Sequence, residues 1–338
     1  MSRAGSRSQS EATQQSLAEA LNALCAEVGI PFEEMLHTVE GALAVAYVRA
    51  FNPPGAVTVK LDTKTGALHV RSRVVHTDGT VTEAELPSED FKRMAAQTAK
   101  HAVLRHIHDL ERDKVLRDVA EHRGELASGV VDRIEAGVVY VDLGRAEGVM
   151  PPEEQIPGEA LQPGRPVLVV ILDTQHNRRQ AQVRVSRASR SFVHRLLEAE
   201  VPEIKAGTVQ VRAIAREPGL RTKIGVSSSE PGLDPVGACV GPKGVRHRAI
   251  LSELVNEHID IVPWSDEPAA FVAAALGPAK VEKVTIDRVT RTATVLVPRG
   301  QLSLAIGRDG QNARLAAKLT GFRIDIKPSE TDAETLPP

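Results

Sequence analysis

Two Gly-x-x-Gly tetrapeptides with matching surroundings occur in the last third of this 338-residue chain. The first is Gly241-Pro242-Lys243-Gly244 and the second is Gly307-Arg308-Asp309-Gly310. Arg248 follows the first motif at the same distance at which Arg314 follows the second, and an Ile-Asp-Ile triplet comes after each. Repetition at one period indicates that one supersecondary unit is used twice. The function must therefore suit a duplicated module, which favours binding along an extended polymer.

The residues around each tetrapeptide predict a tight turn between two helices. Asp234 is a good helix N-cap and Pro235 a natural first helical residue, so a short helix should run into Gly241. Apolar residues recur at helical spacing after Gly244. The glycines permit close approach of a backbone, and the second helix offers free N–H groups and the positive end of its dipole. Such a turn suits a phosphodiester, and the apolar strand at 259–262 is placed to line a groove for bases.

This arrangement resembles a KH domain, whose GxxG loop holds about four nucleotides of single-stranded nucleic acid. A P-loop fits worse, because Pro242 stands where the second glycine of GxxxxGK[ST] belongs. We expect Lys243 and Arg308 to meet phosphates. Asp309 stands where a cation is expected, so the second loop either binds more weakly or relies on backbone N–H groups. The predicted RNA-contacting residues of the two units are Gly241, Pro242, Lys243, Gly244, Arg246, Arg248, Gly307, Arg308, Asp309, Gly310, Gln311, Asn312 and Arg314. For each flanking charge, a solvated helix face is the alternative.

Composition limits the other classes of function. Net charge is −2, so any attraction for nucleic acid must come from local groups rather than from the whole chain. Cys25 and Cys239 have no metal or disulfide spacing, and no apolar run approaches the roughly 18 residues of a membrane span. These features predict a cytoplasmic protein without membrane contact. The segments 1–14 and 329–338 read as disordered tails.

Catalytic and metal sites find little support in the sequence. No paired carboxylates, and no Ser or Cys with a candidate base, form a recognisable motif. His106 and His108 are two residues apart, so on a helix they point to different sides, and we expect a solvated pair. The chain is therefore predicted to be neither an enzyme nor a cofactor or metal carrier.

Residues 15–122 predict a mixed α/β domain. Strand alternation lies between amphipathic helices, with a turn at Asp78-Gly79, and a long helix should run from about Ser88 to Glu121. Pro31 should open the second helix. The apolar positions that mark the first two helices are Leu17, Leu21, Leu24, Val28, Met35, Val39, Leu43, Tyr47 and Phe51.

Residues 123–188 predict five short strands, which fits a small OB barrel. Their order resembles the RNA-binding OB domain that is repeated in the largest small-subunit ribosomal protein. Members of that group that stack RNA carry aromatics on two strands and a His after the third. Here only Tyr140 is present, and Pro151 stands at the expected His. Tyr140 is the candidate RNA contact of this domain, and whether the domain binds RNA itself stays open.

The whole order resembles the NusA family of bacterial transcription elongation factors. The match extends from about residue 15 to 327 and is most specific at 201–204, 216–219, 234–243, 258–264 and 305–316. It implies an α+β multidomain chain: a mixed α/β N-terminal domain, a small OB β-barrel and two tandem bacterial-type KH domains. The expected boundaries are 15–122, 123–188, 189–274 and 275–328.

The resemblance also implies partners. The N-terminal domain would dock on the RNA polymerase core, and the OB and KH domains would hold nascent single-stranded RNA, modulating pausing, termination and antitermination. Other Nus-type antitermination factors and a ribosomal protein are further implied partners, and the chain is expected to be a monomer. A ribosome-associated RNA-binding protein of translation or ribosome assembly is the alternative, and the N-terminal domain decides between them.

Overall fold

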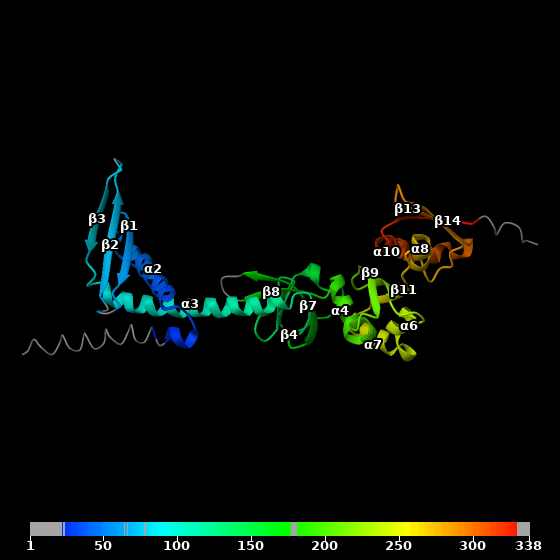
Figure 1. Cartoon of the computed structure of the whole chain (residues 1–338), viewed down its shortest axis with the longest axis horizontal. Helices are drawn as coiled ribbons and strands as arrows, with labels where there is room; N and C mark the ends of the chain where they lie inside the picture. Colours follow the sequence, from blue (N-terminus) through cyan, green and yellow to red (C-terminus); the bar gives the residue numbers. More distant parts are fainter. Residues whose placement is uncertain are drawn as a thin grey trace, which may run out of the picture. The chain divides into compact units, whose positions relative to one another are not determined.

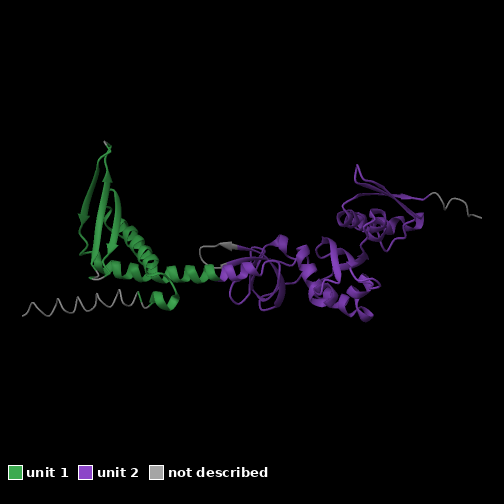
Figure 2. Cartoon of the chain, in the orientation of Figure 1, with its two compact units in different colours: residues 1–114 green, residues 115–338 purple. Residues whose placement is uncertain are grey.

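The structure is a computed structural model that describes residues 22, 24–63, 65, 67–77, 79–176 and 181–329. The predictions for residues 1–14, Leu17, Leu21 and Asp78 lie outside the described residues, as does the predicted tail from 330 onward. Ser329, which the sequence placed in that tail, is buried, and its N–H donates to the Val297 carbonyl at 2.8 Å. The chain packs as two compact units, 1–114 and 115–338 (Figure 2).

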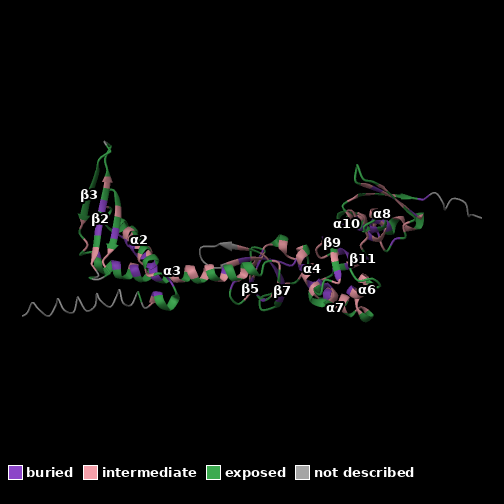
Figure 3. Ribbon diagram, viewed as in Figure 1, coloured by how far each residue is buried: buried purple, intermediate pink, exposed green. Residues whose placement is uncertain are grey.

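In the first unit, helix α2 (Phe32–Phe51) and the beginning of helix α3 (Lys92–Glu121) pack against an antiparallel sheet. The sheet has the order β1-β2-β3, and β3 is exposed along nearly its whole length (Figure 3). Apolar residues at four-residue spacing, Met35, Val39, Leu43 and Tyr47, form the buried stripe of α2. The elements are α2 (Phe32–Phe51), β1 (Ala56–Leu61), β2 (Leu68–Val75), β3 (Val81–Leu86) and α3 (Lys92–Glu121) (Figure 1).

The long helix begins later than its sequence suggests. The Phe91 N–H donates to the Ser88 carbonyl in a turn, and helix α3 starts at Lys92. Phe91 itself is fully buried and meets the Tyr47 ring edge-on, with centroids 5.1 Å apart. The Tyr47 hydroxyl donates to the Pro87 carbonyl at 2.9 Å. Ser88 therefore lies in a turn that seats Phe91 in the core, and it does not open the helix.

Residues 115–188 form a closed five-stranded barrel with the order β4-β5-β6-β8-β7, the OB arrangement. Alternate residues of its strands, such as Val139 and Val141 on β5, fill the interior. Leu116, near the end of α3, is buried in the same cluster, so the last turns of α3 belong to the barrel and not to the first unit. The strands are β4 (Leu126–Glu135), β5 (Val138–Asp142), β6 (Glu147–Met150), β7 (Pro166–His176) and β8 (Ala181–Ser186).

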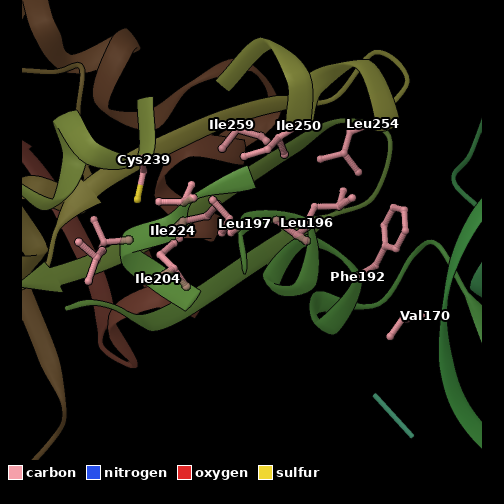
Figure 4. Packing of buried hydrophobic residues seen from close by; sticks show 14 of the residues in the cluster. Val170, Phe192, Leu196, Leu197, Ile204, Ile224, Cys239, Ile250, Leu254 and Ile259 are labelled. Atoms are coloured by element: carbon pink, nitrogen blue, oxygen red, sulfur yellow. The ribbon is translucent and has the colours of Figure 1, made fainter. Parts of the chain in front are cut away.

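The first repeat of the GxxG unit packs helices on one face of a three-stranded sheet. The sheet has the order β11-β10-β9, with β9 antiparallel and β11 parallel to β10. Its core includes Phe192, Ile224 and Leu254, and Val170 of the barrel lies in the same cluster (Figure 4). Ile156 of the barrel also belongs to this cluster. The barrel and this repeat therefore share one hydrophobic core. The elements are α4 (Arg190–Glu200), α5 (Pro202–Lys205), β9 (Val209–Glu217), β10 (Arg221–Ser228), α6 (Pro235–Val240), α7 (Val245–Glu253) and β11 (His258–Pro263).

The second repeat has the same strand pairing in the order β12-β13-β14. Helix α8, most of which the sequence boundary at 274 assigned to the first repeat, packs Phe271 and Val272 into the core of the second. Ala215 and Val262 of the first repeat join this core too, so the two repeats are packed together. The elements are α8 (Pro268–Ala275), β12 (Lys283–Asp287), β13 (Thr292–Val297), α9 (Leu302–Ile306), α10 (Gln311–Thr320) and β14 (Arg323–Pro328). The α+β class with a barrel and two tandem KH domains is confirmed.

Candidate nucleic-acid interface

The two GxxG loops have nearly the same backbone conformation. Gly241 has φ 73° and ψ 170°, and Gly307 has φ 77° and ψ 170°, a region open essentially to glycine alone. The third residue of each loop, Lys243 or Asp309, lies in the left-handed region at φ 52°. Each loop forms a single 3₁₀ turn, η2 (Pro242–Gly244) or η4 (Arg308–Gly310), that leads into α7 or α10. The predicted helix-turn-helix geometry is present twice, with Asp234 capping α6 and accepting from the Val236 N–H.

The first glycine of each loop is also required by close packing. A Cβ on Gly241 would lie 2.7 Å from the Arg246 Cγ, and one on Gly307 would lie 2.8 Å from the Asn312 backbone nitrogen. Each loop is thus pressed against the first turn of the helix that follows it. The tight fold leaves the outer side of the loop, at positions two and three, in solvent.

Two of the predicted contact residues hold the loops from behind. Arg246 donates to the Ala238 carbonyl at 2.6 Å and to Glu203 at 2.8 Å. Asn312, at the equivalent place in the second repeat, is 1% exposed and donates to the Leu276 and Ala305 carbonyls, each at 3.0 Å. Their side chains therefore tie the loops to the preceding helices, and the Asn312 amide does not face solvent.

The equivalent arginines Arg248 and Arg314 brace the loops from the helix side. Arg248 donates to the Lys243 carbonyl at 2.8 Å, and Arg314 donates to the Asp309 carbonyl at 3.2 Å. Both side chains are exposed. Each can therefore fix the loop and still offer N–H groups to an anion.

Charge at the loop tips differs between the repeats. Pro242 and Lys243 are exposed, so the first loop presents an ammonium group to solvent. In the second loop the Arg308 and Asp309 side chains are 96% and 89% exposed, and the Arg308 Nε lies 3.8 Å from an Asp309 carboxylate oxygen. The second tip is close to neutral, which agrees with the weaker electrostatic attraction expected from its sequence.

A single carboxylate joins the second loop helix to the first repeat. Glu217, at the end of β9, accepts from Arg314 at 2.6 and 3.0 Å, and from Gln311 and Lys318 at 3.3 Å each. These hydrogen bonds, above all the one from Arg314, lower the pKa of Glu217 to about 2. Gln311 and Arg314, predicted as RNA contacts, thus lie at the junction of the two repeats. Sequence reasoning did not find Glu217, because it is far from both motifs in the chain.

A second polar cluster also connects the two repeats. Lys223 is fully buried and donates to Asp260 at 2.9 Å and to the Gly277 carbonyl of the second repeat at 3.1 Å. Burial lowers the pKa of Lys223. Arg221 donates twice to the same Asp260 carboxylate. Polar bonds as well as the shared apolar core therefore hold the repeats in one arrangement.

We expect Glu217→Gln to loosen this junction in a pH-dependent way. Because the pKa of Glu217 is depressed in the folded chain, its ionised form stabilises the fold above about pH 4.5, and this stabilisation is lost toward pH 2. At pH 7 the melting temperature should fall by about 2–4 °C, the change for about 1 kcal/mol. Thermal unfolding of wild type and variant between pH 7 and 3 measures it, with exposed Glu282→Gln as the control. A difference that stays constant down to pH 3 would contradict the assignment.

Tyr140 on β5 is half-buried, and one face of its ring is covered. The Arg133 guanidinium carbon lies 3.9 Å from the ring centroid. Arg133 is held there by Asp132, Glu135 and Glu147 at 2.8–2.9 Å. A base could stack only on the opposite face of Tyr140 unless this cluster opened.

The prediction that both His106 and His108 are solvated holds for His108 only. His108 is exposed, but the His106 side chain is only 17% exposed, and its Nε2 lies 3.6 Å from a Glu34 carboxylate oxygen. Within the described residues, no group of three His, Cys, Asp or Glu side chains is arranged to hold a metal ion. No helix of that same part of the chain has the length and apolar character needed to cross a membrane.

Comparison with known proteins finds matches for the N-terminal domain, for both KH domains and for nearly the whole chain. Family models described as the NusA N-terminal domain, the NusA-like first KH domain and the NusA-like second KH domain match residues 16–81, 187–264 and 268–334. The chain is 42% identical to the transcription termination/antitermination protein NusA of Bacillus subtilis, over 95% of this chain and 92% of that protein. It is 41% identical to the protein of the same name from Mycobacterium tuberculosis H37Rv, over 94% of each chain. The solution structure of the B. subtilis NusA N-terminal domain matches 29% of this chain and 98% of that one at 33% identity, with a TM-score of 0.25.

Proposed function

Because the chain belongs to the NusA family of transcription termination/antitermination proteins, we propose that it acts on transcription by holding nascent single-stranded RNA while its N-terminal unit contacts the RNA polymerase core. KH domains are RNA-binding modules, and both are present. The observation that carries the proposal is the pair of GxxG loops with matching backbone angles, set in repeats that share a core.

The exposed groups of the loops supply the phosphate contacts in this proposal. Lys243, Arg248 and Arg308 offer charge, and the backbone N–H groups at the loop ends offer donors in both repeats. Arg246 and Asn312 position the loops. Gln311 and Arg314 are shared between Glu217 and any phosphate that approaches the second loop. The first repeat is therefore the stronger anion site of the two.

The N-terminal unit is assigned to the polymerase on different grounds. It has no GxxG loop, and the family model for the NusA N-terminal domain matches residues 16–81 within it. We further propose a monomeric, cytoplasmic and non-catalytic regulator that modulates pausing, termination and antitermination. Other Nus-type factors and a ribosomal protein are proposed as additional partners in antitermination.

Separating the two units tests this division of labour. Fragments should be cut at 114/115, because Leu116 is part of the barrel core and a cut at 122 would remove it. Fragment 1–114 should bind nuclease-treated core polymerase. Fragment 115–338 should keep RNA binding but lose most pause enhancement, because tethering to polymerase supplies its effective concentration at the RNA.

In vitro pause assays and pull-downs measure both fragments against the full chain at equal concentration. Pause enhancement by 115–338 equal to that of the full chain would contradict the proposal. So would binding of 1–114 to ribosomes and not to polymerase, which would favour a role in translation.

A further inference from the structure

A polar groove of about 820 Å³ opens on the first KH domain, beside the segment 265–267 that leads into the second, and none of the loop contacts described above uses it. Leu233 and Pro235, just before and at the start of α6, line one side. Pro263, the last residue of β11, and Trp264 line another. The GxxG loop follows the opposite end of α6. A strand held at that loop and lying along α6 and β11 would therefore reach this groove.

The groove contains a fixed stacking platform. Trp264 is the only tryptophan of the chain and is half-buried, and its backbone N–H donates to the Val226 carbonyl at 2.7 Å. Its ring packs near Phe271, with centroids 6.2 Å apart. The Arg212 guanidinium carbon lies 4.3 Å from the Trp264 ring centroid, and Arg212 is exposed. Aromatic rings and guanidinium planes are the surfaces on which unpaired RNA bases stack.

Charge around the platform favours a base over a phosphate. Three carboxylates, Glu230, Asp266 and Glu267, line the groove and are exposed, against the single cation Arg212. They repel phosphate oxygens, but they accept hydrogen bonds from amino groups on a base edge. The GxxG loop has the opposite preference, so the two places suit different parts of one nucleotide chain.

We propose that this groove is a nucleobase subsite that receives RNA between the first and second KH domains. The base stacks on the Arg212–Trp264 pair, and the carboxylates favour adenine, cytosine or guanine, which carry exocyclic amino groups, over uracil. The inference rests on the proposed RNA binding by the KH domains and deepens it. A volume of this size can hold a base together with its sugar.

The single tryptophan makes the subsite directly observable in the full-length chain. Its fluorescence is followed during titration with single-stranded RNAs of about 12 nucleotides, four for each KH domain and the rest for the junction. Anisotropy of labelled RNA reports total binding in parallel. We expect a saturable change in Trp264 emission with adenine- or cytosine-containing RNA, and a smaller one when those bases at the junction are replaced by uracil.

Arg212→Ala is the central variant, because its exposed side chain can be removed without opening the core. It should weaken binding of the long RNA about tenfold and leave a four-nucleotide RNA unaffected. Lys283→Ala, which removes an exposed cation elsewhere in the same unit, is the matched control. It should leave the affinity for the long RNA and for the four-nucleotide RNA unchanged. Circular dichroism checks the fold of each variant.

The outcomes separate this inference from the proposed function. RNA binding with unchanged Trp264 emission, and with Arg212→Ala equal to wild type, would overturn the subsite while RNA binding stands. A change in emission with a lysine-rich peptide but not with RNA would also overturn it and assign the groove to a basic protein segment. No RNA binding by the wild-type chain would refute the proposed function together with the subsite.

Discussion

Replacing Pro242, Lys243 and Arg308 together by aspartate should lower the affinity for single-stranded RNA by about 100-fold or more. The three side chains lie at the exposed tips of the two loops, where the glycines let a phosphate approach the backbone. Carboxylates at these positions replace attraction by repulsion at both contacts. Measured at rising salt, the wild-type affinity should fall with a modest slope, because few phosphates are neutralised, and the variant slope should be smaller.

The fold should survive this change for a reason visible in the second loop. Asp309 already occupies the third loop position at φ 52°, the value that Lys243 has in the first. Arg308 stands where the first loop has Pro242, so that position accepts a non-proline residue. Circular dichroism should therefore match wild type, and Lys283→Asp is the control for reversing one lysine charge away from the loops. Undiminished RNA affinity in the folded triple variant would refute the KH assignment of the binding site.

Glu257→Gln should lower the free energy of unfolding much more than Glu217→Gln. Glu257 and Arg216 have side chains that are 0% and 1% exposed, with the Arg216 Nη2 2.9 Å from a Glu257 oxygen. Glu257 also accepts from the Gly219 N–H and the Thr222 hydroxyl, while Arg216 donates to the Arg187 and Ser189 carbonyls. Removing the carboxylate charge leaves a buried guanidinium without its counter-ion, which costs about 3–5 kcal/mol.

Thermal unfolding of the full chain measures this cost, and the transition of the second unit should fall by about 10 °C. Glu253→Gln is the matched control. The Glu253 side chain is 43% exposed and its Oε2 lies 3.8 Å from the Arg187 Nη1, and such exposed ion pairs contribute little to stability. The double variant Arg216→Met with Glu257→Leu should recover part of the loss, because no charge is left unpaired. Equal melting temperatures for Glu257→Gln and the control would mean that the pair does not hold the domain.

Local signals were sufficient for the barrel strands and for the helices and turns around the two GxxG motifs. Asp234 and Pro235 predicted the start of α6, and alternation predicted the five barrel strands, because caps and strand periods depend on neighbours in sequence. The two GxxG motifs predicted the turns that the backbone angles now show, since positive φ is a local requirement that glycine meets.

The start of α3 was predicted at Ser88, and the structure moves it to Lys92, because seating Phe91 against Tyr47 outweighs the capping signal.

By itself the sequence determined the order of modules, the loop geometry and the family. Only the tertiary structure decided which polar residues are available to RNA and which hold the scaffold. Asn312 and Arg246 read as solvent-facing groups beside a loop, yet packing against carbonyls of preceding helices turns them inward. Glu217 with Arg314, Arg216 with Glu257, and Arg212 with Trp264 are each brought together across long stretches of chain. No local period encodes such pairs, because they arise only when separate sheets and helices share a core.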